Sequence, residues 1–142
     1  MANTLMPTSQ SKTRLLLYGA YGYTDRLAAE LAASKKFDVV LTGRNKDALA
    51  GLGDRFSLPT RVVGLNDATQ LSEALKDIAC VVHMAGPFAA TSAPMLNACL
   101  TTQTNYVDIT GEIALIGVIR RELPIFQWIV DSVEKSLFLF FL

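Results

Sequence analysis

The sequence lacks the features that mark several common classes of protein. Its 13 Lys and Arg balance its 13 Asp and Glu, so nothing in the net charge favours binding to nucleic acid or to an anionic membrane. No apolar run approaches the roughly 20 residues that a membrane-spanning helix needs. The two cysteines, Cys80 and Cys99, lie in apolar surroundings without CxxC spacing. This pattern indicates buried, reduced thiols and no metal site.

Recognisable catalytic arrangements are also missing. The chain has no P-loop and no zinc-protease motif, and no tyrosine is followed four residues later by lysine as in short-chain dehydrogenases. Its single histidine, His83, falls inside an apolar run, which favours a hydrogen-bonded core residue over a catalytic one. Asp108 and Glu112 follow a later apolar segment and suit a cleft or a turn equally well. The catalytic residues therefore stay unknown at this level.

The first 12 residues are polar and lack the apolar core of a secretory signal. They are rich in Ser and Thr and contain no acidic residue, which leaves an organelle transit peptide open. The segment is short and poor in arginine, so we expect residues 1–12 to form a disordered leader of a cytoplasmic protein.

The most informative stretch runs from Thr13 to Leu31 and joins an apolar run, a glycine turn and an alanine-rich amphipathic segment. This order predicts the strand, tight turn and helix that open a dinucleotide-binding fold. Gly19 lets the chain reverse direction at the strand end, and Gly22 lets a pyrophosphate approach the backbone. The helix N-terminus that follows favours an anion.

Asp25 stands where the third glycine of this pattern is expected. A carboxylate suits a helix N-terminus, but it repels a bound pyrophosphate by roughly 4 kcal/mol at about 4 Å and an effective dielectric of about 20. A side chain turned outward would reduce this repulsion. Asp25 is therefore the main sequence-level objection to cofactor binding.

The rest of the chain alternates short apolar segments with helical ones. A helix is expected from Lys46 to about Phe56, another after a cap at Asn66 or Asp67 with its apolar positions extending to Ile78, and a third with Pro94 in its first turn. The five expected strands cover 13–18, 37–42, 60–65, 79–85 and 106–109. This alternation predicts a single α/β domain, a Rossmann-like doubly wound parallel sheet with strand order 3-2-1-4-5.

The end of the second strand bears on the choice of cofactor. NAD-binding proteins usually carry an acidic residue there, whereas NADP-binding proteins carry arginine near the 2′-phosphate. This chain has Arg44, followed by Lys46, and no acidic residue until Asp47. Because guanidinium binds phosphate in a bidentate manner, we expect NADP(H) rather than NAD(H).

Four motifs occur in a fixed order, namely Leu17–Thr24, Leu41–Asn45, Ala85–Phe88 and Tyr106–Glu112. Together they resemble the NADP-binding domain of saccharopine dehydrogenase-like oxidoreductases, in particular the group that includes trans-acting enoyl reductases. The resemblance implies a pyrophosphate cradle, a contact to the adenosine phosphate and a loop beneath the nicotinamide. The residues implied are respectively Gly19, Ala20, Tyr21, Gly22, Tyr23 and Thr24; Arg44 and Asn45; and Ala85, Gly86, Pro87 and Phe88.

The resemblance covers residues 13–113, the expected NADP-binding domain. Residues 114–142 diverge from the family pattern and end in an apolar run, 137–142. Family members continue into a second domain that shapes the substrate site and contributes contacts of a homodimer, so the chain is expected to be truncated. The function expected is NADP(H) binding within an oxidoreductase of unknown substrate. The alternative is a non-catalytic remnant or nucleotide-sensing interaction module, in which the apolar end could also dock a partner.

Overall fold

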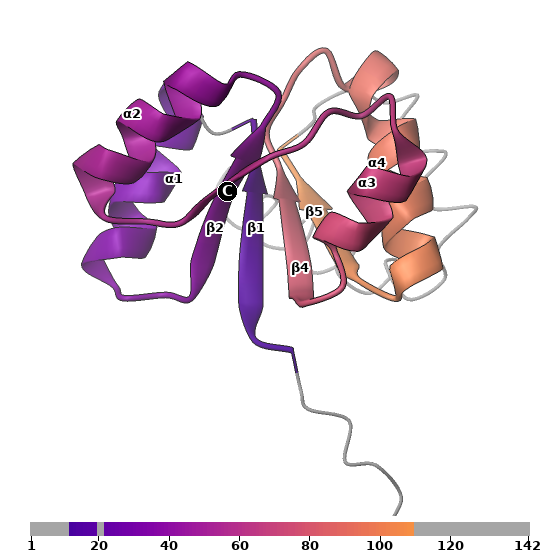
Figure 1. The fold of residues 1–142 in the computed structure, drawn as a ribbon, viewed down its shortest axis with the longest axis horizontal. Coiled ribbons are helices and arrows are strands. Elements are labelled where there is room, and N and C mark those ends of the chain that lie inside the picture. The colour runs from indigo at the N-terminus through magenta and orange to yellow at the C-terminus, as the bar shows by residue number, and fades with distance from the viewer. Residues whose placement is uncertain (1–11, 20–21, 110–142) are drawn as a thin grey trace, which may run out of the picture. The chain divides into compact units, whose positions relative to one another are not determined.

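A computed structural model describes residues 12–19 and 22–109, all within one compact unit, Met1–Ile109. Five parallel strands form one sheet in the order β3-β2-β1-β4-β5, as the sequence predicts (Figure 1). Each neighbouring pair is parallel, and Leu17 of β1 lies beside Leu41 of β2 and Val82 of β4. The strands are β1 (Arg14–Tyr18), β2 (Val39–Gly43), β3 (Thr60–Val62), β4 (Ile78–His83) and β5 (Asn105–Asp108).

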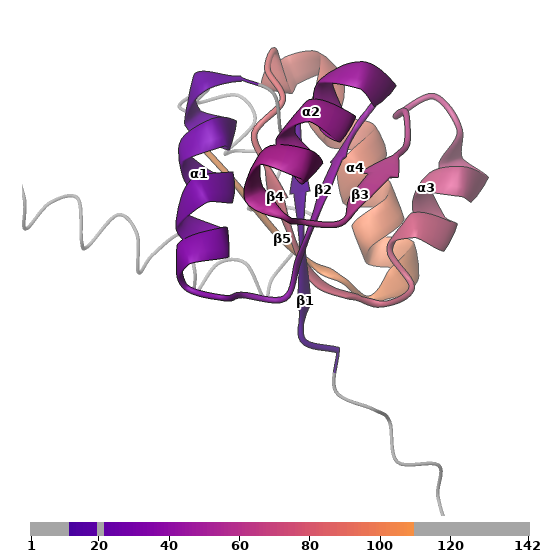
Figure 2. The same ribbon diagram turned by 60° about the vertical axis from the view of Figure 1, so that its left-hand side comes forward.

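In the described part of the chain, four helices cover the two faces of this sheet. Helices α1 and α2 lie on one face, and α3 and α4 lie on the other (Figures 1 and 2). Parallel strands joined by helical crossovers produce this three-layer arrangement. The helices are α1 (Tyr23–Ser34), α2 (Lys46–Phe56), α3 (Ala68–Ala74) and α4 (Phe88–Thr102).

The apolar core lies on both faces of the sheet, because side chains along each strand point alternately to one face and the other. Leu17 and Leu41 belong to an apolar cluster that includes Ala29 of α1 and Leu49 of α2. Successive side chains of a strand point to opposite faces, so Leu16, which is fully buried, faces α3 and α4. Because both faces are covered, the strands read in the sequence as continuous apolar runs rather than as alternating patterns.

Several expected boundaries were wrong. The expected strands 37–42 and 79–85 are Val39–Gly43 and Ile78–His83, and three other boundaries differ by more. The helix after the third strand ends at Ala74, because Leu75 and Lys76 turn back with hydrogen bonds to Ser72 and Glu73, and Ile78 belongs to β4. The third strand stops at Val62 instead of continuing to residue 65, since residues 64 and 65 enter a cleft described below.

The third error concerns α4, which begins at Phe88 after Pro87 and holds Pro94 in its interior. Pro94 has no N–H to donate to the carbonyl of Ala90, which usually weakens a helix. Ala90 and Pro94 both line an open cleft, where solvent can hydrogen-bond this carbonyl. The sequence offers two candidates for the N-cap of α3, Asn66 and Asp67. The structure has Asp67 at this position, and its carboxylate accepts from the amide of Gln70 at 2.9 Å.

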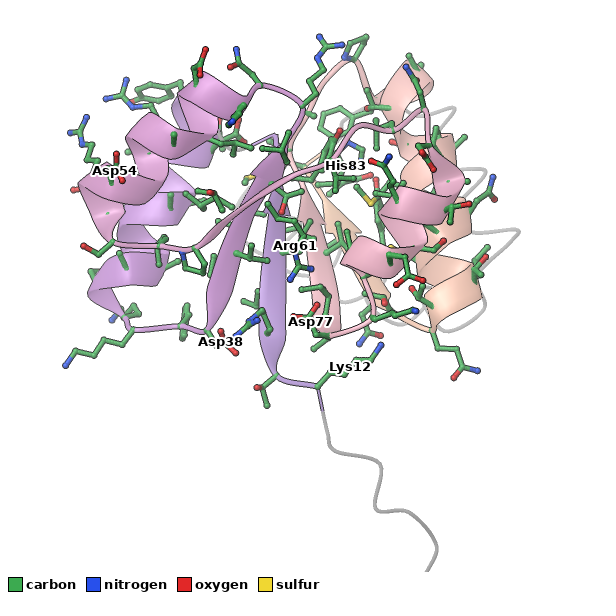
Figure 3. The ribbon with its side chains drawn as sticks, viewed as in Figure 1. Lys12, Asp38, Asp54, Arg61, Asp77 and His83 are labelled. Carbon is green, nitrogen blue, oxygen red and sulfur yellow. The ribbon has the colours of Figure 1, made fainter. Side chains whose placement is uncertain are left out.

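Charged side chains join the strands at the amino edge of the sheet. Arg14 donates to Asp38 at 2.8 Å and to Asp77 at 3.0 Å. Asp77 also accepts from Arg61 of β3 at 3.0 Å, and Figure 3 shows Arg61 and Asp77 beside one another. Asp77 thus joins β1 and β3, which are separated by β2 in the sheet.

Several expectations lie outside the described residues. These are the leader before Lys12, the two loop residues Ala20 and Tyr21, and everything after Ile109, including Glu112 and the segment 114–142. In the described part, Cys99 is buried, Cys80 is half-buried, and both are free thiols.

Candidate functional site

A cleft of about 580 Å³ lies at the carboxyl edge of the sheet, the upper edge in Figure 1. It is formed by the ends of β1, β2 and β4, the segment after β3, and the first turns of α1 and α4. Ligands of open α/β sheets bind at this edge, where the strand order reverses. The lining residues are Tyr18, Gly19, Gly22, Asp25, Arg44, Gly64, Leu65, Asn66, Met84, Ala85, Gly86, Pro87, Ala90, Thr91 and Pro94.

Gly19 allows β1 and the segment after β4 to approach each other closely. Its φ is +97°, a conformation that glycine adopts without steric cost. A Cβ atom built at Gly19 would lie 2.8 Å from the Cβ of Ala85 and 2.9 Å from its backbone nitrogen. The Gly19 amide donates to the carbonyl of Thr42 at 2.9 Å, which fixes the loop against β2 as well.

Gly22 and Asp25 form a local contact at the start of α1. Gly22 is the residue before the helix, and Asp25 is its third residue. The Gly22 amide donates to Oδ2 of Asp25 at 2.8 Å, as in half of a capping box. The Asp25 side chain is turned inward, because the residue is only 4% exposed and lines the cleft. Burial raises the pKa of its carboxyl, and the Gly22 amide opposes this shift.

The loop after β2 places a cation at the cleft. Arg44 is exposed and lines the cleft, and the next residue, Asn45, is the N-cap of α2. The side-chain oxygen of Asn45 accepts from the amide of Ala48 at 3.0 Å. This cap fixes the chain direction directly after Arg44, so the guanidinium projects from a defined backbone position.

The segment after β4 is held by a hydroxyl of α4. Thr91 donates to the carbonyl of Ala85 at 2.6 Å and to that of Pro87 at 3.1 Å. Met84 is tied to β1 through its amide, which donates to the carbonyl of Tyr18 at 2.9 Å. The loop 85–87 is thereby fixed as one wall of the cleft.

A buried polar cluster lies behind this wall. His83 is fully buried, and its Nδ1 is 3.1 Å from the hydroxyl of Tyr106. The same hydroxyl is 2.8 Å from Oδ2 of Asp108 and 3.4 Å from the hydroxyl of Ser92. The ring of Phe88 lies 5.6 Å from the imidazole. His83 is therefore a hydrogen-bonded core histidine, as its position in an apolar run predicts.

Burial controls protonation in this cluster. It lowers the pKa of His83, while the charge of Asp108 and a hydrogen bond with the backbone of Ala85 act in the opposite direction. It raises the pKa of Tyr106 far above the usual range of tyrosine. A neutral imidazole and a neutral phenol therefore share this site near pH 7.

Comparison with known families agrees with the architecture. A family model described as the saccharopine dehydrogenase NADP binding domain matches residues 15–127, which is more than half of the chain. The chain belongs to this family. The resemblance predicted from the four sequence motifs is confirmed. The prediction that the chain is an NADP-binding domain of this family is confirmed as well.

The curated relatives are considerably longer than this saccharopine dehydrogenase-like domain. The trans-acting enoyl reductase of Mycobacterium leprae (strain TN) is 37% identical over 108 residues, which cover 70% of this chain and 25% of that protein. The chain spans 25% to 34% of the length of the first curated relatives that it matches.

Solved structures show the same fold. Saccharopine dehydrogenase from Saccharomyces cerevisiae in its apo form matches with a TM-score of 0.65 and 18% identity, over 75% of this chain and 24% of that one. Triphenylmethane reductase from Citrobacter sp. in complex with NADP(H) matches with a TM-score of 0.58 and 17% identity, over 70% of this chain and 38% of that one.

The cleft of the saccharopine dehydrogenase-like domain brings together half of the twelve residues expected to bind the cofactor. Tyr23 is 80% exposed, Thr24 is exposed, and neither belongs to the cleft lining. Asn45 caps α2, and Phe88 packs on His83. The six that line the cleft are Gly19, Gly22, Arg44, Ala85, Gly86 and Pro87.

Sequence reasoning missed several lining residues of this domain. Gly64 and Leu65 were assigned to a strand, although the glycine could have marked its end. Thr91 and Ala90 line the cleft because α4 begins six residues before Pro94, and the sequence carries no separate signal for this early start.

In the part of the chain that the structure describes, no helix is long and apolar enough to cross a membrane. The same residues contain no cluster of three or more His, Cys, Asp or Glu side chains that could hold a metal ion.

Proposed function

We propose that the cleft binds NADP(H), with the glycine loop at the pyrophosphate, Arg44 at the 2′-phosphate of the adenosine, and the loop 85–87 on the nicotinamide side. The observation that carries this proposal is the convergence of Gly19, Gly22 and Arg44 with this loop in one open cleft of about 580 Å³. A volume of this size is typical of a cofactor cleft. The two glycines leave space at the backbone, and Arg44 supplies the cation that phosphate requires.

The twelve residues proposed to hold the dinucleotide have different roles. Gly19 and Gly22 would face the pyrophosphate together with Ala20, Tyr21, Tyr23 and Thr24, and Arg44 would distinguish NADP(H) from NAD(H), with Asn45 fixing its backbone. The loop 85–87 and Phe88 would limit the position of the nicotinamide.

We infer that the chain contributes to redox chemistry by holding the cofactor. Bound NADP(H) supplies hydride transfer, and the protein supplies position and electrostatics. His83 and Tyr106 lie behind the loop 85–87 and are not among the cleft-lining residues. The complete oxidoreductase, its substrate and any homodimer are proposals that rest on the family.

Calorimetric titration with NADPH and, separately, with NADH tests the cofactor assignment. We expect NADPH to bind with micromolar affinity and NADH to bind more weakly. Arg44→Gln should reduce the NADPH affinity about 10- to 100-fold, because a hydrogen bond to a charged group contributes about 1.5–3 kcal/mol, and should change the NADH affinity little. Arg55→Gln, at an exposed arginine of α2 outside the cleft lining, is the matched control.

Two results would contradict the proposal. One is a folded wild-type chain that binds neither dinucleotide, and the other is an equal loss of NADPH and NADH affinity in Arg44→Gln. The inward position of Asp25 favours one second candidate, a nucleotide-sensing or interaction module that has lost cofactor use. In that case the wild-type chain binds neither dinucleotide, and Asp25→Gly restores NADPH binding.

A further inference from the structure

Asp25 lines the same cleft as Gly19 and Gly22, the two glycines proposed to face the pyrophosphate. Its Oδ2 already accepts from the Gly22 amide at 2.8 Å, and this amide is a donor that the glycine turn offers to a pyrophosphate. Its other oxygen, Oδ1, is buried and has no hydrogen-bond partner among the described residues. Asp25 is thus a residue of the cleft lining that is 4% exposed and has one of its two carboxyl oxygens hydrogen-bonded.

The charges around Asp25 do not neutralise it. Arg44, beyond the end of β2, is the one cationic side chain in the described cleft lining, and Tyr18 of β1 is the one other titratable group there. Arg26 and Glu30 of α1 are exposed to solvent. Burial raises the pKa of Asp25, and the hydrogen bond from the Gly22 amide lowers it.

A phosphate that reaches Gly22 therefore meets a carboxylate. In its ionised form Asp25 repels the anion and offers it no donor. In its neutral form Oδ2 still accepts from Gly22, while a proton on Oδ1 gives the unpartnered oxygen an O–H that donates to a phosphate oxygen.

We propose that Asp25 couples dinucleotide binding to proton uptake, so that the anionic ligand binds as Oδ1 of Asp25 takes a proton from solvent. The new bond is the O–H bond of the carboxylic acid, and the buffer loses the proton. This inference rests on the proposed binding of NADP(H) in the same cleft. It makes Asp25 a specificity-determining residue that links affinity for the dinucleotide to pH.

The direction of the effect follows from linkage. A ligand that favours the protonated form binds more weakly as pH rises, by up to about tenfold per pH unit between the carboxyl pKa of the free chain and that of the complex. Burial has already raised the pKa of Asp25 in the free chain, and a nearby phosphate raises it further. The window accordingly lies above the usual range of aspartate.

The test compares wild type with Asp25→Asn. Asparagine can accept from the Gly22 amide and donate from its own amide group, so it imitates the neutral acid at every pH. Asp54→Asn is the matched control, because Asp54 is an exposed residue of α2 and points away from the sheet in Figure 3. Thermal unfolding of each variant establishes that it is folded.

NADPH dissociation constants are measured by calorimetry at about pH 5.5 and about pH 8. We expect the wild-type constant, divided by that of Asp25→Asn, to be larger at about pH 8 than at about pH 5.5. Division by the variant removes the titration of the 2′-phosphate and of His83, which are common to both proteins. Near pH 7, two buffers with different ionisation enthalpies should show additional proton uptake on binding by wild type and by Asp54→Asn that Asp25→Asn lacks.

The outcomes separate this inference from the proposed function. If wild type and Asp25→Asn both bind NADPH with a ratio that does not change with pH, the proton coupling is refuted and cofactor binding stands. If neither folded protein binds NADPH at either pH, the proposed function fails and the coupling fails with it. Equal proton uptake by wild type and Asp25→Asn also overturns the coupling.

Discussion

Replacing Gly19 with alanine tests the close approach between β1 and the segment after β4. The new Cβ would lie 2.8 Å from the Cβ of Ala85, and 2.9 and 3.0 Å from its backbone nitrogen and Cα. Ordinary contact begins at 3.4 Å, and two of these three atoms are backbone, so the strand ends must move apart. Overpacking of this kind costs about 1–3 kcal/mol.

The backbone adds a second term, because Gly19 has a φ of +97°. A side chain in this region costs about 1–3 kcal/mol. Alanine also restricts the unfolded chain, which offsets about 0.4–1 kcal/mol. We therefore expect Gly19→Ala to lower the free energy of unfolding by about 1–5 kcal/mol.

Urea unfolding followed by far-UV circular dichroism measures this difference. Gly64→Ala is the control, since Gly64 lines the same cleft and a Cβ there meets nothing within 4 Å. Adding Ala85→Gly to Gly19→Ala should restore only part of the loss, because it removes the 2.8 Å contact but leaves both backbone contacts and the φ. A loss below about 1 kcal/mol, or full recovery in the double variant, would refute the reasoning.

Two further predictions concern positions away from the cleft. Gly51→Ala should raise the free energy of unfolding by about 0.5–1 kcal/mol in the same assay, because Gly51 is an exposed interior residue of α2 and a Cβ added there meets nothing within 4 Å; a decrease would contradict this. The hydrogen bond and charge of the Arg61 guanidinium lower the pKa of Asp77. The ion pairs of Asp77 therefore stabilise the folded chain above about pH 4, and this stabilisation is lost as pH falls further. Asp77→Asn should therefore be less stable than wild type at pH 7, by about 1 kcal/mol or less for a half-exposed carboxylate, and the difference should shrink in urea titrations at about pH 3; a difference that stays constant would count against these ion pairs.

The sheet was predictable because its signals are local. Continuous apolar runs separated by capping residues such as Asn45 and Asp67 define parallel strands and the starts of helices, and handedness restricts their order. The boundaries at Ile78 and Pro94 were less predictable, since each depends on a neighbouring element. Ile78 fits a helical spacing in the sequence, but pairing with Arg14 of β1 places it in a strand.

The cleft was predictable in its location but only partly in its residues. Strand ends meet at one edge of any parallel sheet, so Gly19, Arg44 and Ala85 could be assigned to it in advance. The direction of the Asp25 side chain could not, because a carboxylate in a first helical turn can face solvent or fold back on the preceding amide with little local difference. In the structure Asp25 lines the cleft together with Arg44 and Ala85, which lie far from it in the sequence.

The ion pairs of Asp77 and the cleft lie at opposite ends of the strands. Arg14, at the start of β1, belongs to these ion pairs, and Tyr18, at its end, lines the cleft. The five residues of β1 therefore separate the two features. Substitutions far apart usually contribute additively to stability. Protein engineering could therefore raise the stability of the chain at the amino edge first. Destabilising substitutions that reshape the cleft for another nucleotide would then be tolerated, because the stability changes at the two ends add independently.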